Sequence, residues 1–205
     1  MTAPTAGLRE RKKVATRQAL HEAAVRLAVE HGLERLTVEA IADAADVSRR
    51  TFSNYFPNKE EALLWSDRVR IVRLLELVAQ RPDGEPPWQA MSAAALELVT
   101  GSAHDPRWTA QVRLLRRHPS LLAQQVAQYA DAERGLVELL TARLPQEPDA
   151  PLRARLLAAT LLTTLRVAVQ EWIEDPATPL PGVLARALTL AAPADPPQAG
   201  AAEGR

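Results

Sequence analysis

The sequence predicts an all-α protein with a three-helix, helix-turn-helix head at its N-terminus and a larger helical body behind it. Three observations predict this fold class. Apolar residues recur at helical spacing in the long segments, no run alternates polar and apolar residues as a strand does, and Pro or Gly bounds the segments of the body. At 205 residues and 47% apolar content, the chain can bury one core in the head and another in the body.

The head is predicted from residues 37 to 64, which read TVEAIADAADVSRRTFSNYFPNKEEALL. Thr37 is a good N-cap, and apolar residues follow it at helical spacing through Ala45. Asp46 tolerates the conformation of a tight turn, and Val47 supplies an apolar plug between two crossing helices. This predicts a short supporting helix that ends at a corner.

A second helix follows the corner, with Ser48 as its N-cap. Phe52 and Phe56 lie on one face of this helix, and Arg50 and Asn54 point roughly the opposite way. The polar side chains on its flanks are Thr51 and Ser53. A helix with aromatic residues in the core and this polar set outside is suited to enter the major groove of DNA.

These motifs resemble the TetR (tetracycline-repressor) family. The stretch RQALHEAAVRLAVEHG at 17–32 is similar to the family's first helix, with Gly32 at its C-terminal cap, and TVEAIADAADVS, TF and NYFPNKEE follow at the family's spacing. The chain departs from the family in having Asp46 where Gly is usual and Ala28 where a large aromatic residue is usual. Neither departure removes a DNA contact. Because Ala28 is small, we expect side chains from other parts of the head to fill the space that the aromatic residue usually occupies beside the first helix.

The resemblance implies a homodimeric transcriptional regulator, most simply a repressor, that inserts residues 48–55 of each head into successive major grooves of a double-stranded operator. Residues expected at base edges are Arg49, Arg50 and Ser53, with Glu39 a weaker candidate. Those expected to grip phosphate are Thr37, Thr51, Asn54, Tyr55 and Lys59, and Ser48 belongs to the same DNA-binding set.

The net charge of the chain is zero, but its distribution is uneven. Basic residues collect near the N-terminus and beside the reading helix, and they are Arg9, Arg11, Lys12, Lys13, Arg17, Arg49, Arg50 and Lys59. The N-terminal cluster is either a solvated tail or an arm that contacts phosphates, and its position ahead of a helix-turn-helix favours the arm.

Behind the head, Asn58 and Glu61 form a capping-box pattern that opens a linking helix through about residue 80. The Pro-rich break at 81–87 ends this helix. Further helices are predicted at about 87–102, 106–117, 119–143, 149–174 and 180–192. We therefore divide the chain into a DNA-binding head at 1–64, an effector-binding and dimerisation body at 65–192, and a disordered tail at 193–205.

The segment 149–174 carries two apolar stripes, so it should be buried on both sides, once by the body and once by a dimer partner. With the helix at 180–192 it would form a two-fold four-helix interface, and the sequence leaves open which stripe faces the partner. The stripe assigned to the dimer interface comprises Leu157, Leu161, Leu165, Ala168 and Trp172. Arg166, beside Leu162 on the other stripe, either pairs with a carboxylate across the dimer or lines a ligand pocket.

The ligand pocket of the body is assigned to Trp108, Val112, Arg113, Arg116, Arg166 and Gln170. Arg113 and Arg116 could hold an anionic head group beside an apolar channel. The runs RLLRRHPSLL at 113–122 and LLAATLLTTLRVAVQEW at 156–172 also resemble the TetR subgroup typified by the mycofactocin-system regulator, whose C-terminal domain implies an amphipathic, acyl-CoA-like effector. The alternatives are a sensor of drugs or antibiotics and an architectural DNA-binding protein without an effector.

Other function classes find no support in the sequence. There are no cysteines, which excludes disulfides and zinc fingers, and the chain has no HExxH, GxSxG, P-loop or GxGxxG motif. We expect no catalytic site, no metal site and no cofactor. The longest apolar run lies between Arg155 and Arg166 and is too short for a membrane span, so a cytoplasmic protein is expected.

Overall fold

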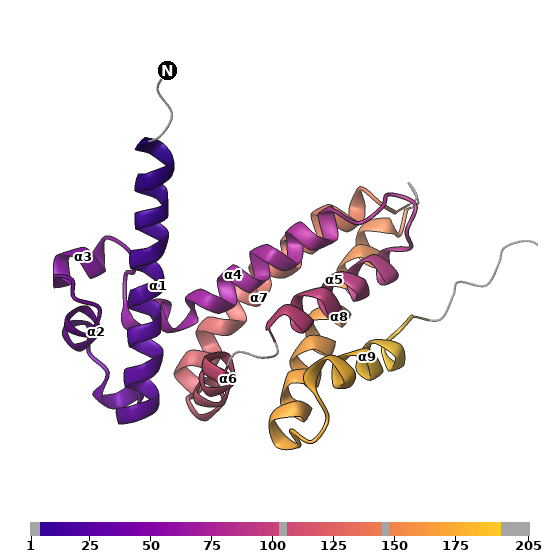
Figure 1. Ribbon diagram of the computed structural model, residues 1–205. Helices are drawn as coiled ribbons and strands as arrows, with labels where there is room; N and C mark the ends of the chain where they lie inside the picture. The colour runs from indigo at the N-terminus through magenta and orange to yellow at the C-terminus, as the bar shows by residue number, and fades with distance from the viewer. Residues whose placement is uncertain (1–4, 103–105, 145–147, 194–205) are drawn as a thin grey trace, which may run out of the picture.

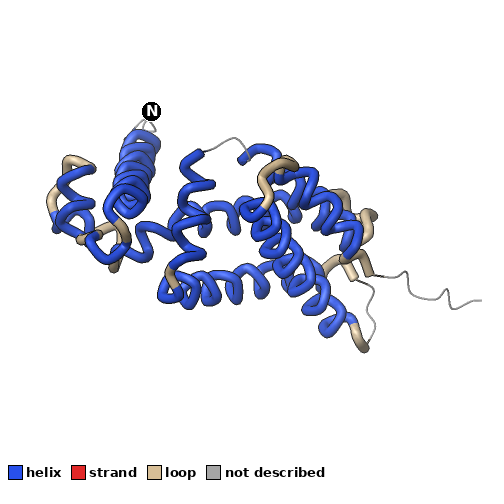
Figure 2. The backbone as a smooth tube through the Cα atoms, turned by 90° about the horizontal axis from the view of Figure 1, so that it is seen from below, coloured by secondary structure: helices blue, strands red, loops and turns tan. Residues whose placement is uncertain are grey.

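A computed structural model of the chain describes the backbone of residues 5–102, 106–144 and 148–193. The predicted all-α class is confirmed: this part of the chain contains helices and loops and no strand (Figures 1 and 2). The predicted tail lies outside the described residues except for Pro193. The helices are α1 (Thr5–His31), α2 (Val38–Ala44), α3 (Arg49–Ser53), α4 (Lys59–Ala79), α5 (Pro87–Ser102), α6 (Pro106–Arg117), α7 (Pro119–Thr141), α8 (Ala150–Glu174) and α9 (Leu180–Leu190), with a 3₁₀ turn at Leu33–Arg35.

Helix α1 is longer than the sequence led us to expect. The basic segment ahead of residue 17 continues the helix as far as Thr5 and is not an extended arm. Figure 1 shows this end of α1 standing clear of the rest of the head, and residues 7–15 are all exposed. The charged segment is thus presented to solvent on a helical support.

The predicted N-caps are present at the three helices that follow. The side-chain oxygen of Thr37 accepts a hydrogen bond from the amide of Ala40 at 3.1 Å, and the hydroxyl of Ser48 accepts one from the amide of Thr51 at 3.0 Å. At α4, Oδ1 of Asn58 accepts a 2.8 Å bond from the amide of Glu61. Each cap satisfies an amide that the first turn would otherwise leave unpaired.

The corner between α2 and α3 has the geometry of a Schellman motif. Asp46 adopts a φ of 54°, the left-handed region in which Asp is better tolerated than most residues. Its amide donates to Asp43 O at 3.1 Å, and the amide of Val47 donates to Ala42 O at 3.0 Å. Asp46 thus fills the turn position where glycine would be unstrained.

The buried side chains form two clusters. One lies in the head, among α1, α2, α3 and the start of α4, and the other lies in the body, among the end of α4 and helices α5 to α9. Helix α4 belongs to both clusters and runs from the head into the body in Figure 1. Leu114 of α6 and Leu121 of α7, which the sequence assigned to the body, are buried in the head cluster. The head therefore packs directly on the corner between α6 and α7.

The C-terminal end of α4 is fixed by Arg143, just beyond α7. The Arg143 guanidinium donates hydrogen bonds to the carbonyls of Arg81 at 2.7 Å, Pro82 at 2.9 Å and Val78 at 3.1 Å. A cation at this point also complements the negative end of the α4 dipole.

Candidate nucleic-acid interface and ligand cavity

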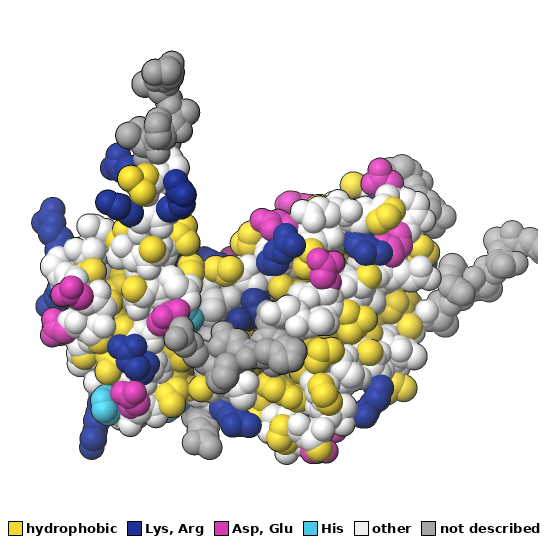
Figure 3. All heavy atoms as spheres, in the orientation of Figure 1, with side chains coloured by type: hydrophobic (Ala, Val, Ile, Leu, Met, Phe, Trp, Pro, Cys, Tyr) yellow, Lys and Arg dark blue, Asp and Glu magenta, His cyan; other side chains and the backbone are white. Residues whose placement is uncertain are grey.

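The reading helix α3 divides its side chains as predicted. Phe52 and Phe56 are buried in the head cluster, with ring centroids 5.9 Å apart. The polar residues Ser48, Arg49, Arg50, Ser53 and Asn54 are all exposed. This leaves one face of α3 able to approach a DNA groove. Figure 3 shows cationic side chains at the outer edge of this head and around the protruding end of α1.

Two candidates for base contacts are paired with each other. Arg49 Nη1 lies 2.8 Å from Oε1 of Glu39 on α2, and both side chains are more than half exposed. An exposed pair of this kind is worth little in stability. It does hold the Arg49 guanidinium over α2, and it places a carboxylate beside the reading face.

Some candidates for phosphate contacts are occupied within the head. The ammonium of Lys59 donates to the carbonyls of Leu36 at 2.8 Å and Leu33 at 3.2 Å, so it closes the 3₁₀ turn onto α4. Tyr55 is half-buried, and the guanidinium of Arg17 lies 5.8 Å from its ring centroid. Thr37 is exposed, whereas Thr51 is half-buried and its hydroxyl hydrogen-bonds to that of Ser48 at 2.8 Å.

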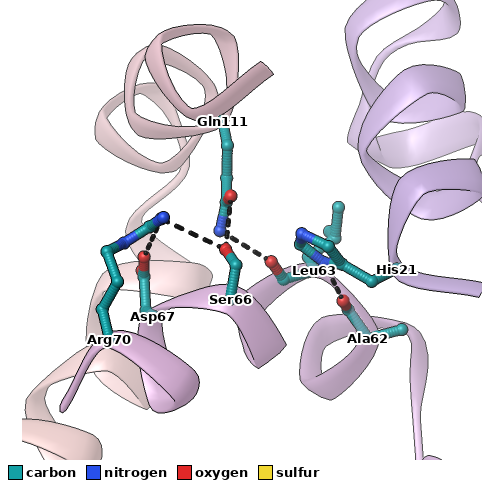
Figure 4. Close-up of polar contacts among 7 residues, drawn as sticks. All are labelled: His21, Ala62, Leu63, Ser66, Asp67, Arg70 and Gln111. Atoms are coloured by element: carbon teal, nitrogen blue, oxygen red, sulfur yellow. Dashed lines mark hydrogen bonds and ion pairs between the residues drawn. The ribbon is translucent and has the colours of Figure 1, made fainter. Parts of the chain in front are cut away.

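A polar network joins the head to the body (Figure 4). The hydroxyl of Ser66 on α4 donates to Oε1 of Gln111 on α6 at 2.7 Å, and Nε2 of Gln111 donates to the carbonyl of Leu63 at 2.9 Å. Nη2 of Arg70, one turn further along α4, donates to Ser66 Oγ at 3.2 Å and to Asp67 Oδ1 at 3.0 Å. The network ties α6 to α4 through side chains of both helices.

His21 of α1 is a buried member of the same junction. Its Nδ1 lies 2.8 Å from the carbonyl oxygen of Ala62, so the neutral ring carries its proton on Nδ1, and the ring meets Trp65 edge-on at 5.4 Å. Burial lowers the pKa of His21 below its usual 6.5, and the hydrogen bond to Ala62 opposes this only in part. The sequence favours a surface or capping position for His21, because a lone histidine on a helix gives no sign of burial, and the structure corrects this expectation.

Two cavities lie on either side of a shared wall. The junction cavity, of about 650 Å³, lies between α1, α4 and α6, and the body cavity, of about 130 Å³, lies among α4, α5, α6, α7 and α8. Arg70, Leu98 and Trp108 line both cavities. The Arg70 guanidinium lies 5.0 Å from the Trp108 ring centroid, and Trp108 stacks on Trp172 at 5.6 Å. The wall between the cavities is thus held by an aromatic pair and an arginine that belongs to the junction network.

The predicted ligand residues divide between the body cavity and the surface. Trp108, Val112 and Arg166 line the body cavity. Arg113 is exposed and lines neither cavity, and Gln170 also lines neither, so the structure does not support a pocket role for these two. The side chain of Arg116 lies outside the described part of the structure.

Gln128 and Tyr129 of α7 also line the body cavity, and Gln128 is not among the ligand residues predicted from the sequence. The side chain of Gln128 is only 7% exposed, and its buried Oε1 accepts no hydrogen bond from any residue that the structure describes. A glutamine in a helix gives no sequence signal of this kind, because its burial depends on how α7 packs.

The stripe of α8 assigned to the dimer interface needs correction. Leu161 and Ala168 are 0% and 1% exposed within one chain, and Leu157 is buried beside them in the body core. Leu165 and Trp172 are partly buried and pack on the same core. These side chains point inward because α7 and α9 cover that side of α8, as the contacts between these helices show.

A different stripe of α8 faces outward. Leu152 is 58% exposed, Leu156 is 60% exposed and Val167 is 48% exposed, and Ala159 and Thr163 lie between them on the same exposed side. Leu190, at the end of α9, is 88% exposed. Helix α8 therefore has one apolar side in the body core and a second apolar side exposed, but the exposed side is formed by other residues than the stripe that the sequence assigned to the dimer interface.

The described residues contain no helix long and apolar enough to cross a membrane. They also contain no group of three or more His, Cys, Asp or Glu side chains that could hold a metal ion.

Comparison with known families finds two matches that together cover most of the chain. Residues 20–64 match the family described as bacterial regulatory proteins, tetR family, and residues 85–196 match the family described as the MftR C-terminal domain. The first match ends near the start of α4, and the second begins in the loop that follows this helix.

Individual relatives agree with these matches. The HTH-type transcriptional regulator TcmR of Streptomyces glaucescens is 36% identical over 177 residues, which cover 81% of this chain and 76% of TcmR. A structure of SmeT with triclosan has 23% identity and a TM-score of 0.62, covers 86% of this chain and 90% of that one, and shows the fold. A structure of the TetR-family repressor FadR of Thermus thermophilus with lauroyl-CoA has 25% identity and a TM-score of 0.52, and covers 90% of this chain and 100% of that one.

Proposed function

This chain belongs to the TetR family and is a DNA-binding transcriptional regulator, and from that premise we propose that it is a homodimeric repressor released from its operator by a small molecule. The observation that carries the proposal is the junction network. Arg70 lines the body cavity and is hydrogen-bonded to Ser66, which is hydrogen-bonded to Gln111 of α6, and Gln111 in turn donates to the carbonyl of Leu63 in the head. A ligand that moves Arg70 therefore alters the contact that sets the angle of the head.

In the DNA-bound state, residues 48–55 of each head enter a major groove. Arg50 and Ser53 are the main base-reading residues in this proposal, because both are exposed on α3. Arg49 reaches a base edge after it leaves Glu39. Thr37 and Asn54 contact phosphates, whereas Lys59 contributes mainly by holding the head together. The operator is a palindrome with half-sites about 34 to 36 Å apart, or slightly more.

Two copies pair through the outward stripe of α8, centred on Leu156, together with α9. Large apolar side chains that are half exposed or more, gathered on one helix face, are typical of an interface and are unfavourable in water. Pairing two such stripes in a two-fold four-helix bundle buries them and fixes the distance between the two heads. The cytoplasm, where the chromosome lies, is the compartment that this function requires.

The effector occupies the body cavity. An acyl-CoA is the first class of effector to test, since the chain matches the MftR C-terminal domain and the FadR relative was described with lauroyl-CoA. A cavity of about 130 Å³ is too small for a long acyl chain. Binding of an acyl-CoA therefore requires Trp108 to move, so that the body cavity opens into the junction cavity. A compact drug-like or antibiotic-like molecule, the second class, fits the body cavity without that movement.

The proposal is tested by DNA release. A duplex that the full-length protein selects from a random library would be labelled, and its release followed by fluorescence anisotropy against acyl-CoAs of increasing chain length and against compact aromatic compounds. Release by either class supports an effector-controlled repressor, with coupling typically about 1 to 3 kcal/mol. If no compound of either class shifts the melting temperature or the DNA affinity, an architectural protein without effector is the better description.

A further inference from the structure

Among the described residues that line the body cavity, Gln128 has a buried side-chain oxygen without a hydrogen-bond donor. Gln128 is more than nine-tenths buried, lines the cavity, and its Oε1 accepts no hydrogen bond within the described part of the chain. A buried amide oxygen without a donor is unfavourable, and groups of this kind in natural proteins are usually satisfied by a ligand or an ordered water. Gln128 is therefore a group to which the occupant of the cavity should bind.

The remaining walls restrict what the occupant can be. They are largely apolar and include the rings of Trp108 and Tyr129, and the charged residues among them are Asp67, Arg70 and Arg166. An apolar protein cavity of about 150 Å³ holds one benzene molecule, and the body cavity measures about 130 Å³. Aromatic side chains favour another ring in stacked or edge-to-face contact. Size and walls together point to a single six-membered aromatic ring, or to the terminal ring of a larger molecule.

The chemistry of the amide then selects the substituent. A carboxamide offers both an acceptor and donors, and its oxygen and nitrogen ends can exchange by a flip of the side chain. A hydroxyl group both donates and accepts, so it satisfies Gln128 in either orientation. An ether can only accept, and it leaves the carbonyl oxygen of the amide without a donor.

We propose that the body cavity is selective for hydroxylated aromatic rings, and that Gln128 is the residue that confers this selectivity by hydrogen-bonding to the ring hydroxyl. This inference rests on the proposed function, because it names the class of effector that the body cavity takes. An acyl-CoA would instead need the larger space that forms when the body cavity opens into the junction cavity.

The test uses three small probes with the full-length protein. Phenol has the ring and the hydroxyl, anisole is its methyl ether and cannot donate, and cyclohexanol has the hydroxyl without the aromatic ring. Isothermal titration calorimetry at millimolar probe concentration should give one phenol per chain, bound about tenfold more tightly than anisole, the factor expected for satisfying one buried polar group. Cyclohexanol should also bind more weakly than phenol.

Gln128→Met keeps the length of the side chain and removes its hydrogen-bonding groups. It should bind phenol and anisole equally, with anisole affinity unchanged or higher, and it should fold normally because it removes an unsatisfied buried amide. Gln89→Met, at an exposed position of α5, is the matched control and should keep the tenfold preference. A second variant, Val112→Phe, fills the cavity and should abolish binding of both probes.

Equal affinity of the unaltered protein for phenol and anisole would overturn the inference, as would a preference that survives in Gln128→Met. Failure of the proposed function gives a different result. If phenol is selected through Gln128 but never changes affinity for the selected duplex, the hydroxyl-selective site stands and effector control of repression does not. If acyl-CoA releases the duplex while phenol shows no preference over anisole, effector control stands and the hydroxyl-selective site does not.

Discussion

The hydroxyl of Ser66 on α4 donates a 2.7 Å hydrogen bond to Oε1 of Gln111 on α6, and Nε2 of the same Gln111 donates to the carbonyl of Leu63 in the head at 2.9 Å, so Gln111 joins the head to the body. Gln111 is 2% exposed, so its amide has no access to water in place of these partners. The bond lies between the two hydrophobic clusters, where α4 passes from one to the other. Its position makes the junction a rigid connection.

The first prediction concerns this connection. Gln111→Leu removes the bonds to Ser66 and to the carbonyl of Leu63 and leaves both partners buried or half-buried, so the free energy of unfolding should fall by about 1 to 3 kcal/mol. Urea denaturation measures this change, and amide hydrogen exchange should become faster in the first half of α4. Gln89→Leu, exposed on α5, should change neither quantity. Unaltered stability of the Gln111 variant would show that the head packs independently of this bond.

The second prediction concerns the end of α4. Arg143→Lys keeps the charge but loses the planar fork that reaches the carbonyls of Val78, Arg81 and Pro82, so the protein should lose about 1 to 3 kcal/mol of stability. Thermal unfolding followed by circular dichroism measures the loss. Arg134→Lys is the control, since Arg134 is exposed on α7 and pairs with Asp131 at the surface, where the effect should be within about 0.5 kcal/mol. Equal effects of the two substitutions would indicate that charge alone matters at the end of α4.

The arrangement of helices could be predicted from the sequence because its determinants are local. Thr37, Ser48 and Asn58 cap helices where their residue types indicated, and the Pro residues that begin α5 and α7 lie at the expected boundaries. The N-terminal limit of α1 was missed because basic side chains are compatible with either a coil or a helix, although Pro4 directly precedes Thr5 in the sequence.

The ligand cavity and the interface could be predicted only in part. Both depend on the rotation of helices about their axes, which tertiary packing fixes. The sequence showed that α8 is apolar on more than one side, but a rotation of about 100° per residue separates Leu156 from Leu157, and only packing against α7 and α9 decides which is buried. The same reason explains why Gln128 was missed and why Arg113, which was assigned to the pocket, lines neither cavity.

The third prediction concerns DNA affinity. Glu39→Gln removes a carboxylate from the reading face and releases Arg49, so affinity for any duplex at low salt should rise several-fold, and the salt dependence should steepen by about one phosphate contact. Fluorescence anisotropy titrations between 50 and 200 mM salt, roughly the range in which phosphate contacts are most evident, measure both. Asp43→Asn, an exposed acid at the other end of α2, removes the same charge without releasing an arginine and should leave the slope nearly unchanged. If both variants steepen the slope alike, Arg49 does not reach phosphate or base after it leaves Glu39.

The fourth prediction concerns the dimer. Leu156→Glu places a charge in the middle of the outward stripe of α8, and burying an unpaired carboxylate is costly, so the variant should sediment as a folded monomer. Ala130→Glu introduces the same side chain at an exposed site on α7 and should remain a dimer. Leu161→Glu should instead unfold the body, because Leu161 is fully buried within one chain. A stable dimer of the Leu156 variant would move the interface away from α8.

The last prediction concerns pH and His21. Burial lowers the pKa of this ring in the folded state below its usual 6.5, so the unfolded chain binds the proton more readily than the folded one. The free energy of unfolding therefore has its full value, as far as this ring is concerned, above about pH 6.5. It decreases as the pH falls from there toward the pKa of His21 in the folded state. The bond from Nδ1 to the carbonyl of Ala62 persists in either state of the ring, so desolvation of the charge causes the loss.

His21→Gln keeps a donor for Ala62 and cannot be protonated, so its free energy of unfolding should vary less than that of the unaltered protein between pH 7.5 and pH 5.5, roughly one unit on either side of the usual pKa. Urea denaturation at the two pH values measures the difference. His31→Gln, at an exposed position at the end of α1, should follow the unaltered protein. Because Trp65 meets the His21 ring edge-on, its fluorescence should report the same transition in the folded state. If His21→Gln and the unaltered protein lose stability equally over this range, protonation of another group is responsible.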